Sequence, residues 1–437
     1  MTNDLAVGES TDAESPEHVR RVAYLATAWF FCIMLAYGCI RPIRETLGSM
    51  GTPDELANLM LLTVAVVTAI VPVYGWLAAR LPRRWLVRIV YHFFTACLIV
   101  FGSILWVRRG DALPEWLRVT IFVWVNVFAL LATSVFWSVL ADVFRSEQGK
   151  LWFGKIAAGG TVGAILGALS IFVFGGKVPT TLWMLMAATS LQVGLFAAWR
   201  IERVGRPFQD SRVAADGATR GTGGGIWSGI VAVFKSPYLI AICGYFALIQ
   251  AAGTHLYLQQ AEIVAAEVTL ARRPQLFAGI DFATQMLTLS IQYCLTPWLL
   301  RRIGLAAGLV ALPAAYFVGF GALATRSNLV VLMVAMVAAR AIAYGVTVPS
   351  REVLFTSVTR EQKYKAKNFI DTVVLRGSDA AAGQGIRALM RLVDRLPVVN
   401  VAGSVVCVAW AALGWRLAAM HRRSRREGGE FSGATIS

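Results

Sequence analysis

Residues 56–79 read LANLMLLTVAVVTAIVPVYGWLAA and contain no charged side chain. A helix rises 1.5 Å per residue, so about 20 apolar residues cross the hydrocarbon core of a bilayer. That core holds no water, and every backbone N–H and C=O inside it must be paired within the protein. The segment therefore predicts a transmembrane helix.

Further apolar runs of this length follow one another along the chain. Together with residues 56–79 they give twelve predicted spans, at 22–40, 56–79, 86–106, 119–140, 152–174, 180–199, 237–257, 275–297, 303–324, 328–349, 366–391 and 399–417. The composition agrees, because 57% of residues are hydrophobic and only 15% are charged. We predict an all-α membrane protein with twelve transmembrane helices.

The excess of 41 Lys and Arg over 25 Asp and Glu predicts the orientation. In a soluble chain this excess would suggest nucleic acid as a partner. Here most basic residues fall in loops on the side of the N-terminus, as the positive-inside rule requires of cytoplasmic loops. We therefore expect both termini in the cytoplasm and no nucleic-acid partner. The acidic start of the chain lacks a signal-peptide pattern, so the first span is expected to stay as an anchor.

A long polar gap divides the spans into two sets of six. It contains the glycine-rich run GTGGG at 221–225, which is typical of a flexible linker. The predicted organisation is a cytoplasmic tail, a six-helix bundle, a linker, a second six-helix bundle and a basic tail, at 1–21, 22–199, 200–236, 237–418 and 419–437.

The two halves carry a faint internal repeat. Glu147-Gln148 after span 4 corresponds to Glu361-Gln362 after span 10, and at the same offset Gly163 corresponds to Gly377. Two tandem six-helix halves in the same orientation are the plan of the major facilitator fold, which we therefore expect.

Span 5 carries Gly159, Gly163 and Gly167 at intervals of one helical turn. Small residues at this spacing let a neighbouring helix approach closely, so we expect a tight helix–helix contact. A second interpretation is that this face also slides during transport.

Side chains typical of catalytic or metal sites form no pattern. The six Cys lie in apolar spans without a CxxC pair, and the four His are scattered. We expect no metal, no cofactor and no enzymatic activity.

Charged residues inside or next to spans are the candidates for function. Arg41, Arg44 and Glu45 end span 1 and form either an interfacial collar or an anion site facing a central cavity. Arginine suits the second role, because its planar fork binds phosphate or carboxylate through two hydrogen bonds. Arg340 lies within span 10, where a charge costs roughly 2.5–3.5 kcal/mol on insertion scales. Tyr344 shares its helix face.

Span 11 is too charged to face lipid and should line the pathway or the interface between the halves. Lys367 and Asp371, like Arg376 and Asp379, are spaced to pair along one helix. Asp281 in span 8 could couple to a proton or pair with an arginine. We predict Arg41, Arg44, Arg340, Lys367 and Arg376 for substrate binding, and Glu45, Asp281, Asp371 and Asp379 for coupling or counter-charge.

The loop between spans 2 and 3 resembles the major facilitator signature GxxxD-R/K-xGR-R/K. Gly75, Arg80, Arg83 and Arg84 match it, whereas Ala79 replaces the acid and Pro82 the second glycine. The predicted cytoplasmic gating residues are Gly75, Arg80, Arg84, Asp142, Arg145, Glu147 and Lys150.

Four longer strings resemble the ATP:ADP antiporter family, the nucleotide transporters of obligate intracellular bacteria and plastids. They are RPIRETLG at 41–48, FWSVLADVFRSEQGK at 136–150, FGKIAAGGTVGAILG at 153–167 and YKAKNFIDTVV at 364–374. The resemblance implies that Arg44-Glu45 takes the place of a Lys-Asp pair tied to transport. It also implies that Glu147 with Lys150, and Lys367 with Asp371, match the family's Glu-Ala-Lys-Arg-Phe-Tyr and Lys-Ala-Ala-Ile-Asp strings.

We therefore expect a monomeric secondary-active transporter in the bacterial inner membrane, surrounded by lipids. Its substrate would be a small anion, with ATP and ADP suggested by the resemblance. A rival hypothesis is a major facilitator carrier of an unrelated molecule such as an organic acid, siderophore or drug, with proton coupling. Two further hypotheses are a membrane enzyme and a non-transporting assembly or sensory subunit.

Overall fold

The computed structural model describes most of the chain. The described residues are 16–108, 113–144, 146–215, 233–234, 236–355, 370, 374–393 and 396–433. Every regular element among them is a helix, which confirms the all-α prediction.

Six long helices make up the first half of the chain. They are α2 (Pro16–Gly48), α3 (Pro53–Arg80), α4 (Arg83–Val107), α5 (Glu115–Val143), α6 (Ser146–Phe174) and α7 (Thr180–Ala215). Each contains one of the first six predicted spans. Helix α7 continues past residue 199, where the linker was expected to begin.

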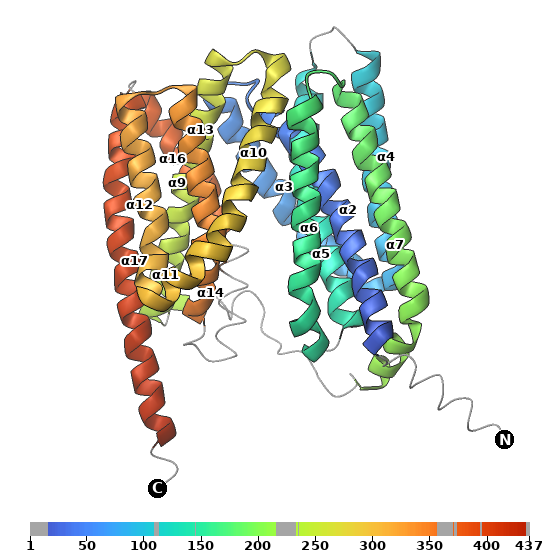
Figure 1. Cartoon of the computed structure of the whole chain (residues 1–437). Coiled ribbons are helices and arrows are strands. Elements are labelled where there is room, and N and C mark those ends of the chain that lie inside the picture. The colour runs from blue at the N-terminus through green and yellow to red at the C-terminus, as the bar shows by residue number, and fades with distance from the viewer. Residues whose placement is uncertain are drawn as a thin grey trace, which may run out of the picture. The chain divides into compact units, whose positions relative to one another are not determined.

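The second half has more helical segments, because two of its spans are interrupted. In order they are α9 (Pro237–Glu267), η2 (Leu270–Arg272), α10 (Arg273–Ser290), η3 (Ile291–Leu295), α11 (Thr296–Arg302), α12 (Leu305–Thr325), α13 (Leu329–Ile342), η4 (Ala343–Thr347), α14 (Val348–Leu354), α16 (Leu375–Val393) and α17 (Leu396–Gly433). Helix α17, red in Figure 1, extends past the end of its neighbour α12.

Ten helices within the described residues are long and apolar enough to cross a membrane. Of the two other predicted spans, 275–297 lies within the interrupted run α10–η3–α11, and the described part of 366–391 lies mostly in α16. Helix α16 carries Arg376, Asp379, Arg387 and Arg391, which keep it out of the apolar set.

The chain forms two compact units by contact. Unit 1 comprises Met1–Gly48, Ala65–Gly221 and Thr269–Phe282, and unit 2 comprises Ser49–Val64, Thr222–Val268 and Ala283–Ser437. Helices α3 and α10 are each divided between the units. The division into bundles at 22–199 and 237–418 follows chain order and stays a prediction.

Helices α2 and α6 of unit 1 pack backbone against backbone. A Cβ atom added at Gly167 would lie 2.7 Å from the carbonyl oxygen of Leu35, and one at Gly38 would lie 2.8 Å from that of Ala164. Added Cβ atoms at Gly159 and Gly163 would clash with Thr27 and Phe31. The predicted tight contact is confirmed, and α2 is the partner.

Two π-helical turns, η3 and η4, interrupt helices of unit 2, and each is followed by a proline. In η4 the N–H of Val348 reaches back to Ala343, and Pro349 has no N–H. The carbonyl of Tyr344 therefore loses the donor that Val348 would supply in a regular α-helix, and the carbonyl of Gly345 receives none from position 349 because that residue is proline.

Side chains from the neighbouring helix replace these donors. Thr296 Oγ1 donates to Gly345 O over 2.7 Å, and Gln292 Nε2 donates to Tyr344 O over 3.3 Å. The two interrupted helices are thus joined through their irregular turns. Such turns often mark functional sites in helices.

Replacing Thr296 with valine should destabilise unit 2. The change keeps the side-chain shape but leaves the Gly345 carbonyl without its side-chain donor, which costs about 1–3 kcal/mol in a buried place. Thr63→Val is the matched control, because Thr63 is equally buried and bonds only the carbonyl of Leu59 in its own helix, over 2.7 Å. Thermal unfolding in detergent should show a lower Tm for Thr296→Val than for Thr63→Val; equal values would contradict the assignment.

Candidate functional site

The end of α2 carries a buried cluster of charges in unit 1. Arg44 Nη1 donates to Asn126 Oδ1 on α5 over 2.9 Å, and Arg44 Nη2 pairs with Glu45. Arg41 Nε lies 3.4 Å from Asp281 Oδ2 and 3.9 Å from Glu45 Oε1. The structure thus brings together four of the predicted site residues.

Helix α10 supplies Asp281 because its first turns pack on α6. The rings of Phe172 and Phe282 stack with centroids 6.4 Å apart, and the Phe172 ring covers Gly279, where an added Cβ would lie 2.9 Å from it. Asp281 is thereby held toward α2. The expected pairing of Asp281 with an arginine is present.

Among the described residues, the cluster pairs two guanidinium groups with two carboxylates. The Glu45 side chain is 2% exposed and that of Arg44 is 13% exposed, so the cluster is an internal network and not a solvated collar. A buried charge costs several kcal/mol unless it is paired. An anionic ligand would have to compete with Glu45 and Asp281 for these arginines.

Unit 2 holds a cavity of about 240 Å³ between α9, α12 and the run from α13 to α14. The described residues that line it include two arginines, Arg340 and Arg351, and none of them is acidic. Tyr257, Tyr316 and Tyr344 also line it. This cavity is therefore cationic and aromatic, the combination that suits an anion with a flat ring system.

One helix face supplies much of this lining. Arg340, Tyr344, Thr347 and Arg351 follow at intervals of four, three and four residues, which is the spacing of one helical stripe. Arg351 also lies over the Phe246 ring, 5.1 Å from its centroid. Arg351 lies two residues past the predicted end of span 10 and was not among the predicted site residues, although its spacing from Arg340 indicates a shared helix face.

Helix α16 makes charged contacts with the start of α3, both in unit 2. Arg387 Nε lies 2.7 Å from Asp54 Oδ1, and Arg387 Nη1 donates to Asn58 over 2.8 Å. Arg391 also pairs with Asp54. These contacts lie within unit 2, to which the start of α3 belongs, and the place of α16 at the pathway or between the halves stays a prediction.

The structure describes two of the four predicted site residues of span 11. Asp379 accepts a hydrogen bond from Thr254 on α9, and Arg376 is partly exposed on the first turn of α16. Lys367 and Asp371 lie outside the described residues. Their roles stay predictions.

The predicted gating residues are only partly brought together. Arg83 pairs with Asp142 and donates to Ser138 O over 2.8 Å, whereas Arg80 lies over the Trp76 ring, 4.6 Å from its centroid. An added Cβ at Gly75 would meet nothing within 4 Å. Arg145 lies outside the described residues, and for Glu147 and Lys150 only their place in α6 is described.

Solved structures with a similar fold are membrane transporters. A bacterial homologue of the iron transporter ferroportin, in an inward-facing state, has a TM-score of 0.59 at 15% identity, covering 91% of this chain and 100% of its own. A bacterial homologue of the lysosomal transporter Spinster has a TM-score of 0.56 at 14% identity, covering 94% and 98%. The nucleoside transporter NupG has a TM-score of 0.55 at 13% identity, covering 92% and 98%.

The fold is that of the major facilitator transporters. The expected architecture is thereby confirmed over nearly the whole chain. No family model and no curated protein sequence matches the chain. The resemblance to the ATP:ADP antiporters thus stays a prediction.

Proposed function

We propose that the chain is a secondary-active membrane transporter that carries an anionic solute by alternating access, and that the solute is a nucleotide. The cationic cavity of unit 2 carries this proposal. Arg340 and Arg351 would bind phosphate oxygens, and the tyrosines would stack on the base. A charge in a membrane helix is costly and persists where it serves a pathway or a partner.

The cluster of unit 1 would supply the switch. Arg44 and Arg41 would exchange Glu45 and Asp281 for the substrate during the cycle, so the carboxylates would act as counter-charges while the site is empty. Such an exchange keeps the buried arginines paired at each stage, which avoids the cost of an isolated charge. The resemblance of Arg44-Glu45 to a transport-linked Lys-Asp pair supports the same role.

The proposal includes the membrane and the orientation. We propose that the protein lies in a bacterial inner membrane. Both termini would be cytoplasmic, because most basic residues fall in loops on the side of the N-terminus. The protein would work as a monomer, without a cofactor. Lys367, Arg376, Asp371 and Asp379 remain proposed members of the pathway.

Ligand-induced stabilisation of the purified full chain tests this proposal. ATP and ADP should raise the Tm in detergent, because a ligand at 100 times its Kd adds about 2.7 kcal/mol to the stability of the folded state. Adenosine, which has the base but no phosphate, should raise it less. Arg340→Gln should reduce the nucleotide effect strongly, since a hydrogen bond to a charged group contributes about 1.5–3 kcal/mol.

Arg326→Gln is the matched control, because Arg326 is an exposed arginine at the end of α12 in the same unit. It should keep the full response. Equal stabilisation by adenosine and ATP, unchanged in Arg340→Gln, would remove the anion from the proposal and favour an uncharged solute.

A further inference from the structure

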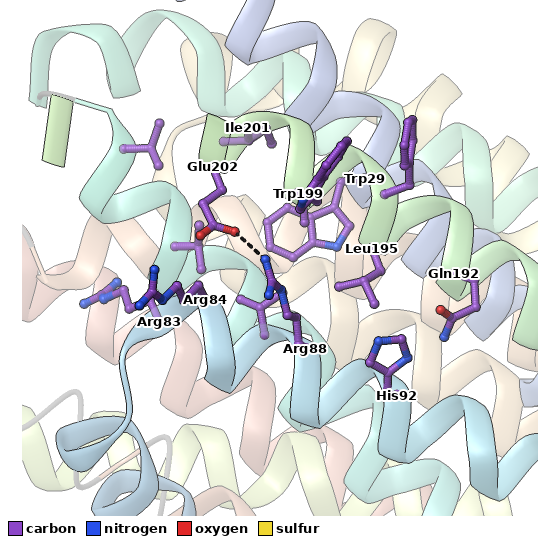
Figure 2. Close-up of a pocket in the computed structure, with 15 residues that line it drawn as sticks. Trp29, Arg83, Arg84, Arg88, His92, Gln192, Leu195, Trp199, Ile201 and Glu202 are labelled. Atoms are coloured by element: carbon purple, nitrogen blue, oxygen red, sulfur yellow. Dashed lines mark hydrogen bonds and ion pairs between the residues drawn. The ribbon is translucent and has the colours of Figure 1, made fainter. Parts of the chain in front are cut away.

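A second cavity, of about 290 Å³, lies in unit 1 between α4 and α7. Figure 2 shows Arg83, Arg84, Arg88 and His92 on one side of it, and Trp199 with Leu195 on the other. The arginines that line it come from the first turns of α4. The proposed transport function assigns no role to the residues that line this cavity.

The cavity carries an excess of positive charge. Among the described residues, three arginines line it against one acidic residue, Glu202. Glu202 Oε2 lies 3.2 Å from Arg88 Nη2, and Arg83 is engaged by Asp142 and Ser138. For Arg84 the described residues supply no acidic partner, and its side chain is exposed. One guanidinium in the cavity is therefore available to an external anion.

Two more arginines lie next to the cavity on α7. Arg203 lies over the ring of Trp199 at 3.8 Å from its centroid, and Arg200 lies over Phe196 at 5.2 Å. Both rings line the cavity. Their guanidinium groups add positive charge beside the apolar wall.

The wall and the surrounding surface are apolar. Phe196 lines the cavity and is 55% exposed, and on α4 Trp85 and Ile89 are 49% and 46% exposed. On membrane-spanning helices, exposed side chains of this kind contact lipid tails. The cavity thus opens on a surface that is apolar along the helices and cationic at one end.

From these observations we infer that the cavity binds the headgroup of an anionic phospholipid. Arg84 and Arg88 hold the phosphate, and an acyl chain lies along Phe196 and Trp199. Basic pockets between membrane helices on the cytoplasmic side are suited to such headgroups, and the first turns of α4 lie on that side in the predicted orientation. The apolar wall favours a lipid over a soluble phosphate, because a soluble phosphate has no acyl chain that could contact it.

Lipid binding to the purified full chain in detergent tests the inference, with native mass spectrometry as the readout. Phosphatidylglycerol should bind more tightly than phosphatidylcholine. Arg84→Gln should weaken phosphatidylglycerol binding about fivefold, the equivalent of roughly 1 kcal/mol per arginine at an anionic headgroup. Arg84→Lys, which keeps the charge, should restore most of it.

Glu202→Gln should act in the opposite direction. It removes the carboxylate that occupies Arg88, so binding should tighten by a few-fold. Arg301→Gln is the matched control, an exposed arginine at the end of α11, and should leave binding within twofold of the original protein. The Tm of each variant without lipid reports whether it is folded.

Three outcomes overturn the inference. Equal binding of phosphatidylcholine would show that headgroup charge is not recognised. Equal effects of Arg84→Gln and Arg301→Gln would show general surface attraction. Competition by millimolar inorganic phosphate that depends on Arg84 would assign the cavity to a soluble anion.

Discussion

Replacing Gly167 with leucine is expected to abolish the folded protein. The backbones of α2 and α6 touch at this position, where an added Cβ would lie 2.7 Å from the Leu35 carbonyl oxygen and 3.0 Å from Gly38 Cα. Both neighbours are backbone atoms and cannot turn aside. Overpacking a core usually costs 1–3 kcal/mol, and a leucine between two backbones should exceed about 3 kcal/mol.

Gly154→Leu on the same helix is the control. An added Cβ at Gly154 would meet nothing within 4 Å, so this variant gains helix propensity without a clash. Yield of monodisperse protein and Tm in detergent should be near normal for Gly154→Leu and very low for Gly167→Leu. Comparable values for the two would contradict the close approach of α2 and α6.

Replacing Glu45 with alanine should give the second large effect. Glu45 is 2% exposed and pairs with Arg44, and it lies 3.9 Å from Arg41 Nε. Breaking a buried ion pair from one side costs about 3–5 kcal/mol, because the remaining charge loses its compensation. Glu45→Gln, which keeps the shape, should fall between the original protein and the alanine variant.

Glu17→Ala provides the comparison. Glu17 also lies beside an arginine, with its Oε1 3.9 Å from Arg20 Nη2, but both side chains are exposed, Glu17 at 86% and Arg20 at 57%. Such a surface pair contributes about 0–1 kcal/mol. From these two magnitudes, the losses in free energy of unfolding should differ by more than about 2 kcal/mol between the two variants. Equilibrium unfolding in mixed micelles measures them. Similar losses would mean that the Glu45 cluster is solvated.

Much of the fold could be predicted because the bilayer limits the choices. An uncharged run such as 56–79 has to form a helix in lipid, and the spacing of Gly159, Gly163 and Gly167 indicates a close neighbour. The sequence does not state which helix that neighbour is. Its identity as α2 depends on tertiary packing, which local patterns do not encode.

The sequence predicted many of the residues of the candidate site, but it did not predict how their charges neutralise one another. Arg44, Glu45 and Asp281 stand out as charges beside apolar runs, but only the fold shows that two carboxylates neutralise the arginines. Asn126 was missed, because one amide in an apolar span is a weak signal. Arg351 was missed because span 10 was predicted to end at residue 349, whereas the helix continues through α14.

Counterflow into liposomes tests the central claim most directly. Purified protein is reconstituted into vesicles loaded with unlabelled ADP, and uptake of labelled ATP is followed from outside. We predict uptake that requires internal nucleotide and that falls at least tenfold in Arg340→Gln while persisting in Arg326→Gln, a factor of ten corresponding to about 1.4 kcal/mol. Uptake that is absent for every nucleotide and inorganic anion tested, from protein that is folded and inserted, would contradict the claim that this chain carries an anion.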